Sequence, residues 1–176
     1  MPKSILKISC IFILLIGLFC IGGCGSSSKS DEKNTSSQVA QHTNVDFNKI
    51  DEMAKKDFLN SETYPLVQDI SFSMVDRNGR KVIALSAIVG DSISRENLLS
   101  LADSMLRSYG SWASLLYEDT FSPPSKDSYG SVFDDYDAWV IIVPASDPKH
   151  KVYISTPIPA GMQTKKAIEP EDDFRG

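Results

Sequence analysis

Cysteine is nearly absent from this chain of 176 residues, and its three copies, Cys10, Cys20 and Cys24, all lie near the N-terminus. No cysteine follows residue 24. The rest of the chain therefore has no disulfide, no thiol nucleophile and no cysteine-ligated zinc site. Its stability has to come from a hydrophobic core.

Histidine and catalytic motifs are also scarce. The two histidines are His42 and His150. The sequence contains no H-E-x-x-H pair for zinc, no G-x-S-x-G elbow to present a serine and no glycine-rich phosphate loop. A Ser-His-Asp site would have to use His150, because His42 lies in a polar segment that we expect to be flexible. The sequence therefore favours a non-catalytic protein without a cofactor or a metal.

Basic residues do not outnumber acidic ones. The chain has 18 lysines and arginines against 23 aspartates and glutamates, which gives a formal net charge of −5. Proteins that bind nucleic acid need a basic surface, so the charge argues against a nucleic-acid partner. It also disfavours electrostatic adhesion to an anionic lipid surface.

An apolar run near the N-terminus is the most informative feature that is present. Lys3 and Lys7 precede residues 8–21, among which only one serine is clearly polar. This pattern is typical of a secretory signal peptide, whereas a membrane-spanning helix needs ~20 apolar residues. An uncleaved membrane anchor over residues 8–25 is the alternative.

The run ends in Ile21, Gly22, Gly23 and Cys24. These four residues resemble the lipobox of bacterial lipoproteins, which has a hydrophobic residue, two small residues and an acceptor cysteine. The resemblance implies lipidation of the Cys24 thiol, cleavage before it, and a protein anchored in the cell membrane on its extracytoplasmic side. Two acyl chains are enough for stable anchoring. Removing residues 1–23 takes away two lysines and no acid, which leaves a net charge of −7.

Composition divides the remainder into a tether, one domain and a tail. Residues 24–44 comprise the lipidated cysteine and a polar segment with too few apolar residues to fold. Residues 45–157 are enough for one hydrophobic core and too few for two. Residues 158–176 are mostly polar, and we expect them to be disordered.

The clearest local prediction is a β-hairpin centred on Asn78 and Gly79. Residues 67–76 and 81–89 alternate in polarity, and Asn-Gly supplies the two positive φ angles of a type I′ turn. The register follows by counting outwards from the turn, and the two side chains of each resulting pair lie on the same face of the hairpin. The pairs on the apolar face are Asp76 with Lys81, Met74 with Ile83, Phe72 with Leu85, and Ile70 with Ala87.

The opposite face of the hairpin pairs Ser71 with Ser86 and is expected to be more polar. Helices over residues 47–58 and 95–109 would pack on the apolar face instead, since each has an apolar stripe at helical spacing. The Ser71 face is then left to solvent or to a partner.

The remaining segments complete an α+β prediction. Gly110 should stop the second helix, and residues 112–117 then form a third strand or, alternatively, extend that helix. Residues 120–135 resemble a long loop. The last two strands are expected over residues 136–143 and 152–156. We therefore predict a two-layer sandwich, with two helices on one face of a mainly antiparallel sheet of four to five strands.

Acidic and aromatic side chains gather between residues 117 and 137. Their carboxylates suggest a calcium site or the acid and base of an envelope hydrolase, but no D-x-D-x-D-G loop is present and no cleft is indicated. A solvated acidic loop is the simpler interpretation. The members are Tyr117, Glu118, Asp119, Tyr129, Phe133, Asp134, Asp135, Tyr136 and Asp137.

Long loops often carry function, and exposed aromatic residues can anchor a partner. The candidates for such a contact are Tyr117, Tyr129, Phe133 and Tyr136. The alternative is that the aromatic residues of this loop merely cover the edge of the sheet. The sequence thus predicts a lipoprotein held in the lipid bilayer through Cys24, whose small non-catalytic domain binds an envelope protein or glycan. The envelope hydrolase is one alternative, and a lipoprotein of phage or mobile-element origin that blocks a channel or injection machinery is another.

Overall fold

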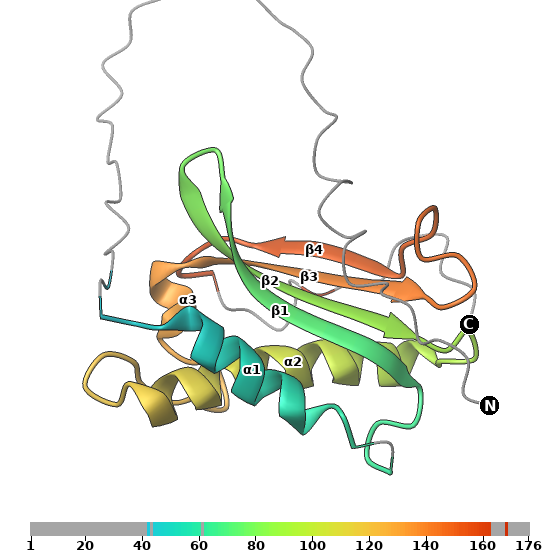
Figure 1. Ribbon diagram of the computed structural model, residues 1–176, viewed down its shortest axis with the longest axis horizontal. Coiled ribbons are helices and arrows are strands. Elements are labelled where there is room, and N and C mark those ends of the chain that lie inside the picture. Colours follow the sequence, from blue (N-terminus) through green and yellow to red (C-terminus); the bar gives the residue numbers. More distant parts are fainter. Residues whose placement is uncertain (1–41, 43, 61, 163–167, 169–176) are drawn as a thin grey trace, which may run out of the picture. The chain divides into compact units, whose positions relative to one another are not determined.

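The computed structural model has a four-stranded sheet with its helices packed on one face (Figure 1). It describes residues 42, 44–60, 62–162 and 168. The predicted α+β class, with two helices on one face of the sheet, is confirmed. The elements are α1 (Phe47–Asp57), β1 (Val67–Arg77), β2 (Arg80–Val89), α2 (Arg95–Leu116), α3 (Val132–Asp135), β3 (Asp137–Pro144) and β4 (Ile154–Ile158).

Strands β1 and β2 form the predicted hairpin in the predicted register. Asn78 and Gly79 have φ angles of 57° and 78°, as a type I′ turn requires. Alternation fixes this register strongly, because a slip of one residue would move the whole apolar set to the other face. The confirmed pairs are Asp76 with Lys81, Met74 with Ile83, Phe72 with Leu85, Ile70 with Ala87, and Ser71 with Ser86.

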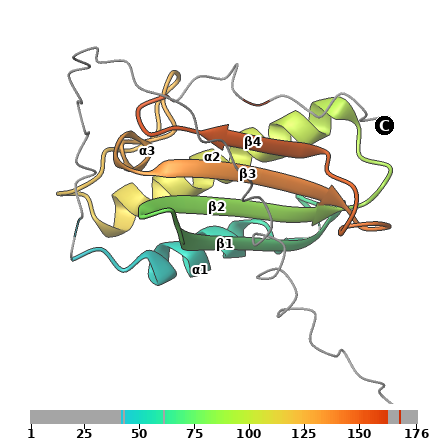
Figure 2. The same ribbon diagram turned by 90° about the horizontal axis from the view of Figure 1, so that it is seen from above.

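The strand order is β1-β2-β3-β4, and the sheet is mixed. Strand β3 runs parallel to β2, whereas β4 is antiparallel to β3. A parallel pair needs a long crossover, which α2 and the segment after it supply. Figure 2 shows the four strands side by side with α1 and α2 behind them.

Both long helices begin at side-chain caps. Asp46 accepts a hydrogen bond from the Asn48 backbone N–H at 3.1 Å and starts α1. Ser94 accepts one from the Asn97 N–H at 3.2 Å and starts α2. Such caps satisfy backbone donors that the first helical turn leaves unpaired.

Gly110 lies inside α2 and does not end it, so the prediction of a helix stop and a third strand over residues 112–117 is wrong. The helix continues to Leu116, as the alternative interpretation had it. A Cβ atom at position 110 would lie only 1.8 Å from the carbonyl oxygen of Tyr129. The glycine therefore marks a close contact between the helix and a later segment, which its position in the sequence does not reveal.

Contacts extend the folded part beyond residues 45 and 157. His42, expected to be flexible, has its Nε2 atom 3.0 Å from Asp135 Oδ2 and packs edge-on against the Phe121 ring. Ile158 is buried at the end of β4, and Ile168 is buried as part of the core. The other residues of the predicted tether and tail lie outside the described residues, apart from Asn44 and residues 159–162.

Candidate functional site

No helix among the described residues covers the face of the sheet that points away from α1 and α2 (Figures 1 and 2). We call this the open face. Strand register determines which side chains it carries. They are Asp69, Ser71, Ser73, Val75 and Arg77 of β1, Arg80, Val82, Ala84, Ser86 and Ile88 of β2, Asp137, Trp139, Ile141 and Val143 of β3, and Ser155 and Pro157 of β4.

The open face is polar on β1 and apolar on β3. Ser71 and Ser73 agree with the expected polar surface, but Trp139 and Ile141 on β3 are half-buried apolar side chains. A strand that is apolar on both faces is usually covered on both. The outer side of β3 therefore has the composition of a contact surface.

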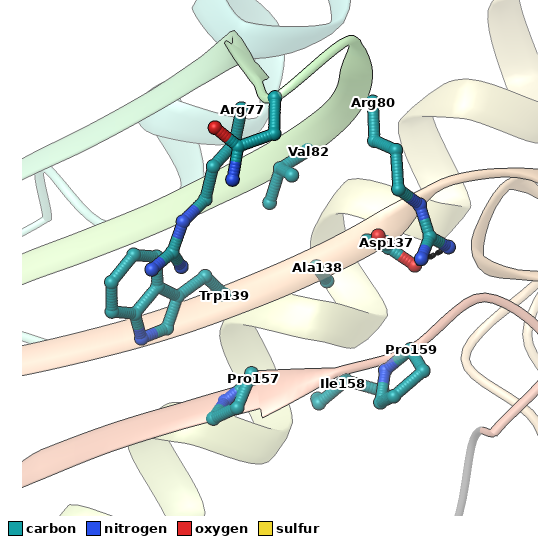
Figure 3. Close-up of a pocket in the computed structure, with 10 residues that line it drawn as sticks. Arg77, Arg80, Val82, Asp137, Ala138, Trp139, Pro157, Ile158 and Pro159 are labelled. Atoms are coloured by element: carbon teal, nitrogen blue, oxygen red, sulfur yellow. Dashed lines mark hydrogen bonds and ion pairs between the residues drawn. The ribbon is translucent and has the colours of Figure 1, made fainter. Parts of the chain in front are cut away.

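A cavity of about 240 Å³ opens at the end of this face, beside the hairpin turn (Figure 3). Its lining combines an apolar surface with a few charged groups that reach in from opposite sides. Ligand sites in proteins commonly have this composition. The lining residues are Arg77, Asn78, Arg80, Val82, Asp137, Ala138, Trp139, Pro157, Ile158 and Pro159.

Arg77 is held by an aromatic ring. Its guanidinium carbon lies 4.3 Å from the centre of the Trp139 ring, and Figure 3 shows the side chain reaching across the indole. The indole Nε1 donates to Ser155 Oγ at 3.2 Å, which fixes the ring. A cation–π contact uses the flat face of a guanidinium and leaves the N–H groups at its edge available. Among the described residues, no carboxylate forms an ion pair with Arg77.

Arg80 is held by a carboxylate on the other side of the cavity. Its Nη2 atom donates to Asp137 Oδ1 at 2.9 Å, and the same oxygen accepts the Ala160 backbone N–H at 2.9 Å. The Asp137 side chain is 18% exposed, against 58% for Arg80. Of the residues that the structure describes, Asp137 is the only carboxylate lining the cavity, and it is engaged. The described lining side chains have a net charge of +1.

Arg77 and Arg80 also face each other directly across the turn. Like charges in opposite positions on paired strands are destabilising. The pair on the other face, Asp76 with Lys81, has opposite charges, as stability favours. An arrangement that works against local stability is expected at a functional site.

Three of the four aromatic residues proposed as partner-binding lie in the core, so the expectation of an exposed patch is wrong. Tyr129, Phe133 and Tyr136 are 2%, 1% and 1% exposed. Tyr117 is half-buried, and its hydroxyl accepts the Asp46 backbone N–H at 2.9 Å. The segment that carries Tyr129 and Phe133 folds back on α2, and this return is a tertiary contact that local sequence cannot indicate.

Tyr129 fastens this segment to α2. Its hydroxyl donates to Asp103 Oδ1 at 3.0 Å, and the Arg107 guanidinium carbon lies 5.2 Å from its ring centre. Burial, together with the charge and hydrogen bond of Asp103, holds the pKa of the Tyr129 phenol well above its usual range. These contacts give Tyr129 a structural role.

The carboxylates of residues 118–137 lie in separate surroundings. Asp135 contacts His42 and Asp137 contacts Arg80, whereas Glu118 and Asp119 are exposed. Over the described ranges, no three or more His, Cys, Asp or Glu residues are grouped so that they could hold a metal ion.

The most perturbed acid lies between the helices. Asp51 on α1 accepts a hydrogen bond from the Tyr109 hydroxyl of α2 at 3.0 Å. Burial raises the pKa of Asp51 to about 6, against the opposing effect of this hydrogen bond, and the charge of Asp46 adds to the rise. Because this pair lies on the helical side of the sheet, it is separate from the open face.

Sequence analysis did not single out Arg77, Arg80 or Trp139. Counting one step from the Asp76–Lys81 pair towards the turn would have placed both arginines on the polar face. Trp139 joins them only through the parallel pairing of β3 with β2, which no local pattern indicates.

Cys24 and its lipobox-like neighbours lie outside the described residues. Within the described part of the chain, no helix is both long enough and apolar enough to cross a membrane. Comparisons with protein-family models, with curated proteins and with solved structures found no match.

Proposed function

We propose that this protein is a bacterial lipoprotein that is anchored through Cys24 and presents a non-catalytic binding domain outside the cytoplasmic membrane. The domain binds its partner, an envelope protein or glycan, through the open face. The lipobox-like residues 21–24 support the anchor. The open face supports the binding role.

The observation that carries the binding role is the outer side of β3. Trp139 and Ile141 are half-buried there, beside a cavity of about 240 Å³, and no described helix covers them. Interfaces are enriched in tryptophan and arginine at their centres, and Arg77 and Trp139 supply both. These residues therefore give the open face the composition of a binding surface.

The segment between the proposed anchor and the domain is long enough for the open face to contact a partner. Residues 25–41, which precede the packed His42, are mostly polar, and a flexible chain of that length would have a root-mean-square span of about 23 Å. Such a tether would let the domain contact partners beyond the lipid headgroups. It would also leave the open face unrestricted in orientation.

Site-specific photocrosslinking in cells tests the binding role. A photoreactive amino acid replaces Ile141 on the open face or, as a matched control, Leu115, which is 68% exposed on α2. We expect the probe at position 141 to form a saturable crosslink with one envelope component, identified by mass spectrometry. That crosslink should be lost in Trp139→Ala.

The probe at position 115 should not capture the same component. Equal capture from both positions, or a crosslink at position 141 that survives Trp139→Ala, would refute binding through this face. So would the absence of any crosslink from position 141.

A further inference from the structure

We propose that the cavity beside Arg77 and Trp139 binds the free carboxylate at the C-terminal end of a peptide that has small apolar side chains. This inference rests on the proposed function, because it names the chemical group of the partner that enters the open face.

The first argument is charge. The two guanidinium groups flank the cavity, with Val82 between them in Figure 3. Asp137 is bound to Arg80 and to the Ala160 N–H, so it leaves the charge of Arg77 without a carboxylate partner among the described residues. Arginine forks match the two oxygens of a carboxylate, and such charge-assisted bonds are the strong ones. One carboxylate on the ligand would neutralise the cavity.

The second argument is preorganisation. Arg77 is stacked on an indole that is itself hydrogen-bonded to Ser155, and Arg80 is fixed by Asp137. Holding flexible side chains in place before binding reduces the entropy lost on binding. The sheet itself therefore holds the two arginines in place for an oxyanion.

The third argument is the charge of the whole chain. A polymer with many phosphates would be repelled by a protein whose formal net charge is −5. A single carboxylate on an otherwise neutral body meets the local positive charge without this general repulsion. The balance of charge therefore favours one acidic group over a polyanion.

The fourth argument is the shape and polarity of the lining. Besides the two arginines and the engaged Asp137, the only polar side chain that lines the cavity among the described residues is Asn78. A sugar acid would bring several hydroxyl groups, and burying each one without a hydrogen-bond partner is unfavourable. The volume of about 240 Å³ is below the ~300–1,000 Å³ of typical ligand pockets, so it suits the end of a larger chain. Small apolar residues fit against Val82, Pro157 and Pro159.

Nuclear magnetic resonance of the full chain in detergent micelles tests this proposal. Labelling tryptophan with ¹⁵N gives two indole N–H signals, from Trp112 and Trp139. The probe is N-acetyl-alanyl-alanine, compared with its C-terminal amide, with glucuronic acid and with inorganic phosphate. We expect the free acid to shift the Trp139 signal saturably and to leave the Trp112 signal in place.

The amide should bind at least about tenfold more weakly, because it lacks the charge that the arginines pair with. Arg77→Gln should weaken binding of the free acid by a similar factor. Arg95→Gln, at an exposed position in the first turn of α2, should leave that binding unchanged. An unchanged Trp112 signal in each variant shows that the fold is retained.

Equal affinity for the acid and the amide would overturn the proposal, and so would tighter binding of glucuronic acid or phosphate than of the peptide. The absence of any Trp139 shift would overturn it too. After any of these three results, the crosslinking experiment shows how much fails. If the photoreactive residue at position 141 still captures a partner, only the ligand class is wrong. If it captures nothing, the proposed function fails as well.

Discussion

Arg77 and Arg80 lie opposite each other across the Asn78-Gly79 turn, and each is held by a different partner: Arg77 by the Trp139 ring, Arg80 by Asp137. The repulsion within the pair and the cation–π contact of Arg77 are of similar size, roughly 0.2–1 kcal/mol each. The charge of Arg77 therefore adds little to the stability of the fold, whereas the charge of Arg80 stabilises it.

Arg77→Gln should change the free energy of unfolding by less than about 0.5 kcal/mol, because the two effects cancel. Arg80→Gln should destabilise by about 1 kcal/mol, because it leaves the largely buried Asp137 without its cation. Urea denaturation of both variants measures this difference. A larger loss from Arg77→Gln than from Arg80→Gln would make Arg77 a structural residue.

Gly110→Ala should destabilise the protein by about 3 kcal/mol, because the new Cβ would lie 1.8 Å from the backbone oxygen of Tyr129. In a helix interior, alanine is otherwise preferred over glycine by about 1 kcal/mol. Gly90→Ala is the matched control, since its Cβ would meet the Leu66 side chain at an ordinary 3.5 Å. Thermal unfolding of both variants measures the change in stability. A neutral or stabilising Gly110→Ala would show that α2 does not approach the Tyr129 carbonyl this closely.

Asp51 should make stability depend on pH. Its pKa rises from 3.8 to about 6 on folding, so the folded state binds more protons, and stability falls as the pH increases from about 4 to about 6. Asp51→Asn removes this dependence and can still accept the Tyr109 hydrogen bond. Because Asp51 is only partly buried, we expect a gain on the order of 1 kcal/mol at pH 7 and little change at pH 4.

Chemical denaturation of the wild type and Asp51→Asn at pH 4, 5, 6 and 7 tests this prediction. Parallel stability curves for the two proteins across that range would contradict it. A difference that grew towards low pH would contradict it too.

Cys24→Ala should abolish lipid attachment. In bacteria that express the full chain, a palmitate analogue should label the wild type and the control Cys20→Ala but not Cys24→Ala. The control is matched because Cys20 lies in the same apolar run, four residues earlier. Equal labelling of all three proteins would remove the lipoprotein assignment.

The hairpin illustrates what the sequence could predict. The turn residues Asn78 and Gly79 and the alternation beside them are adjacent in the chain, so local rules determined the turn and every pair in the register that was counted from it. Arg77 and Arg80 belong to this predictable part of the site. Their position on the open face follows from the same count.

The remainder of the site depends on contacts between distant segments. Trp139 and Asp137 reach the arginines through the parallel pairing of β3 with β2. Tyr129 is buried because its segment returns to α2 at Gly110, where the sequence suggested a helix stop. Glycine is compatible with both a helix end and a close approach, and only the tertiary structure distinguishes the two.

The most direct measurement of the central claim is the affinity of the purified full chain for the envelope component captured from position 141. Trp139→Ala should raise the dissociation constant at least about thirtyfold, because a central tryptophan commonly contributes ~2 kcal/mol or more. Leu115→Ala should leave it unchanged, and circular dichroism should show the same fold for all three proteins. An unchanged dissociation constant in Trp139→Ala would contradict binding through the open face.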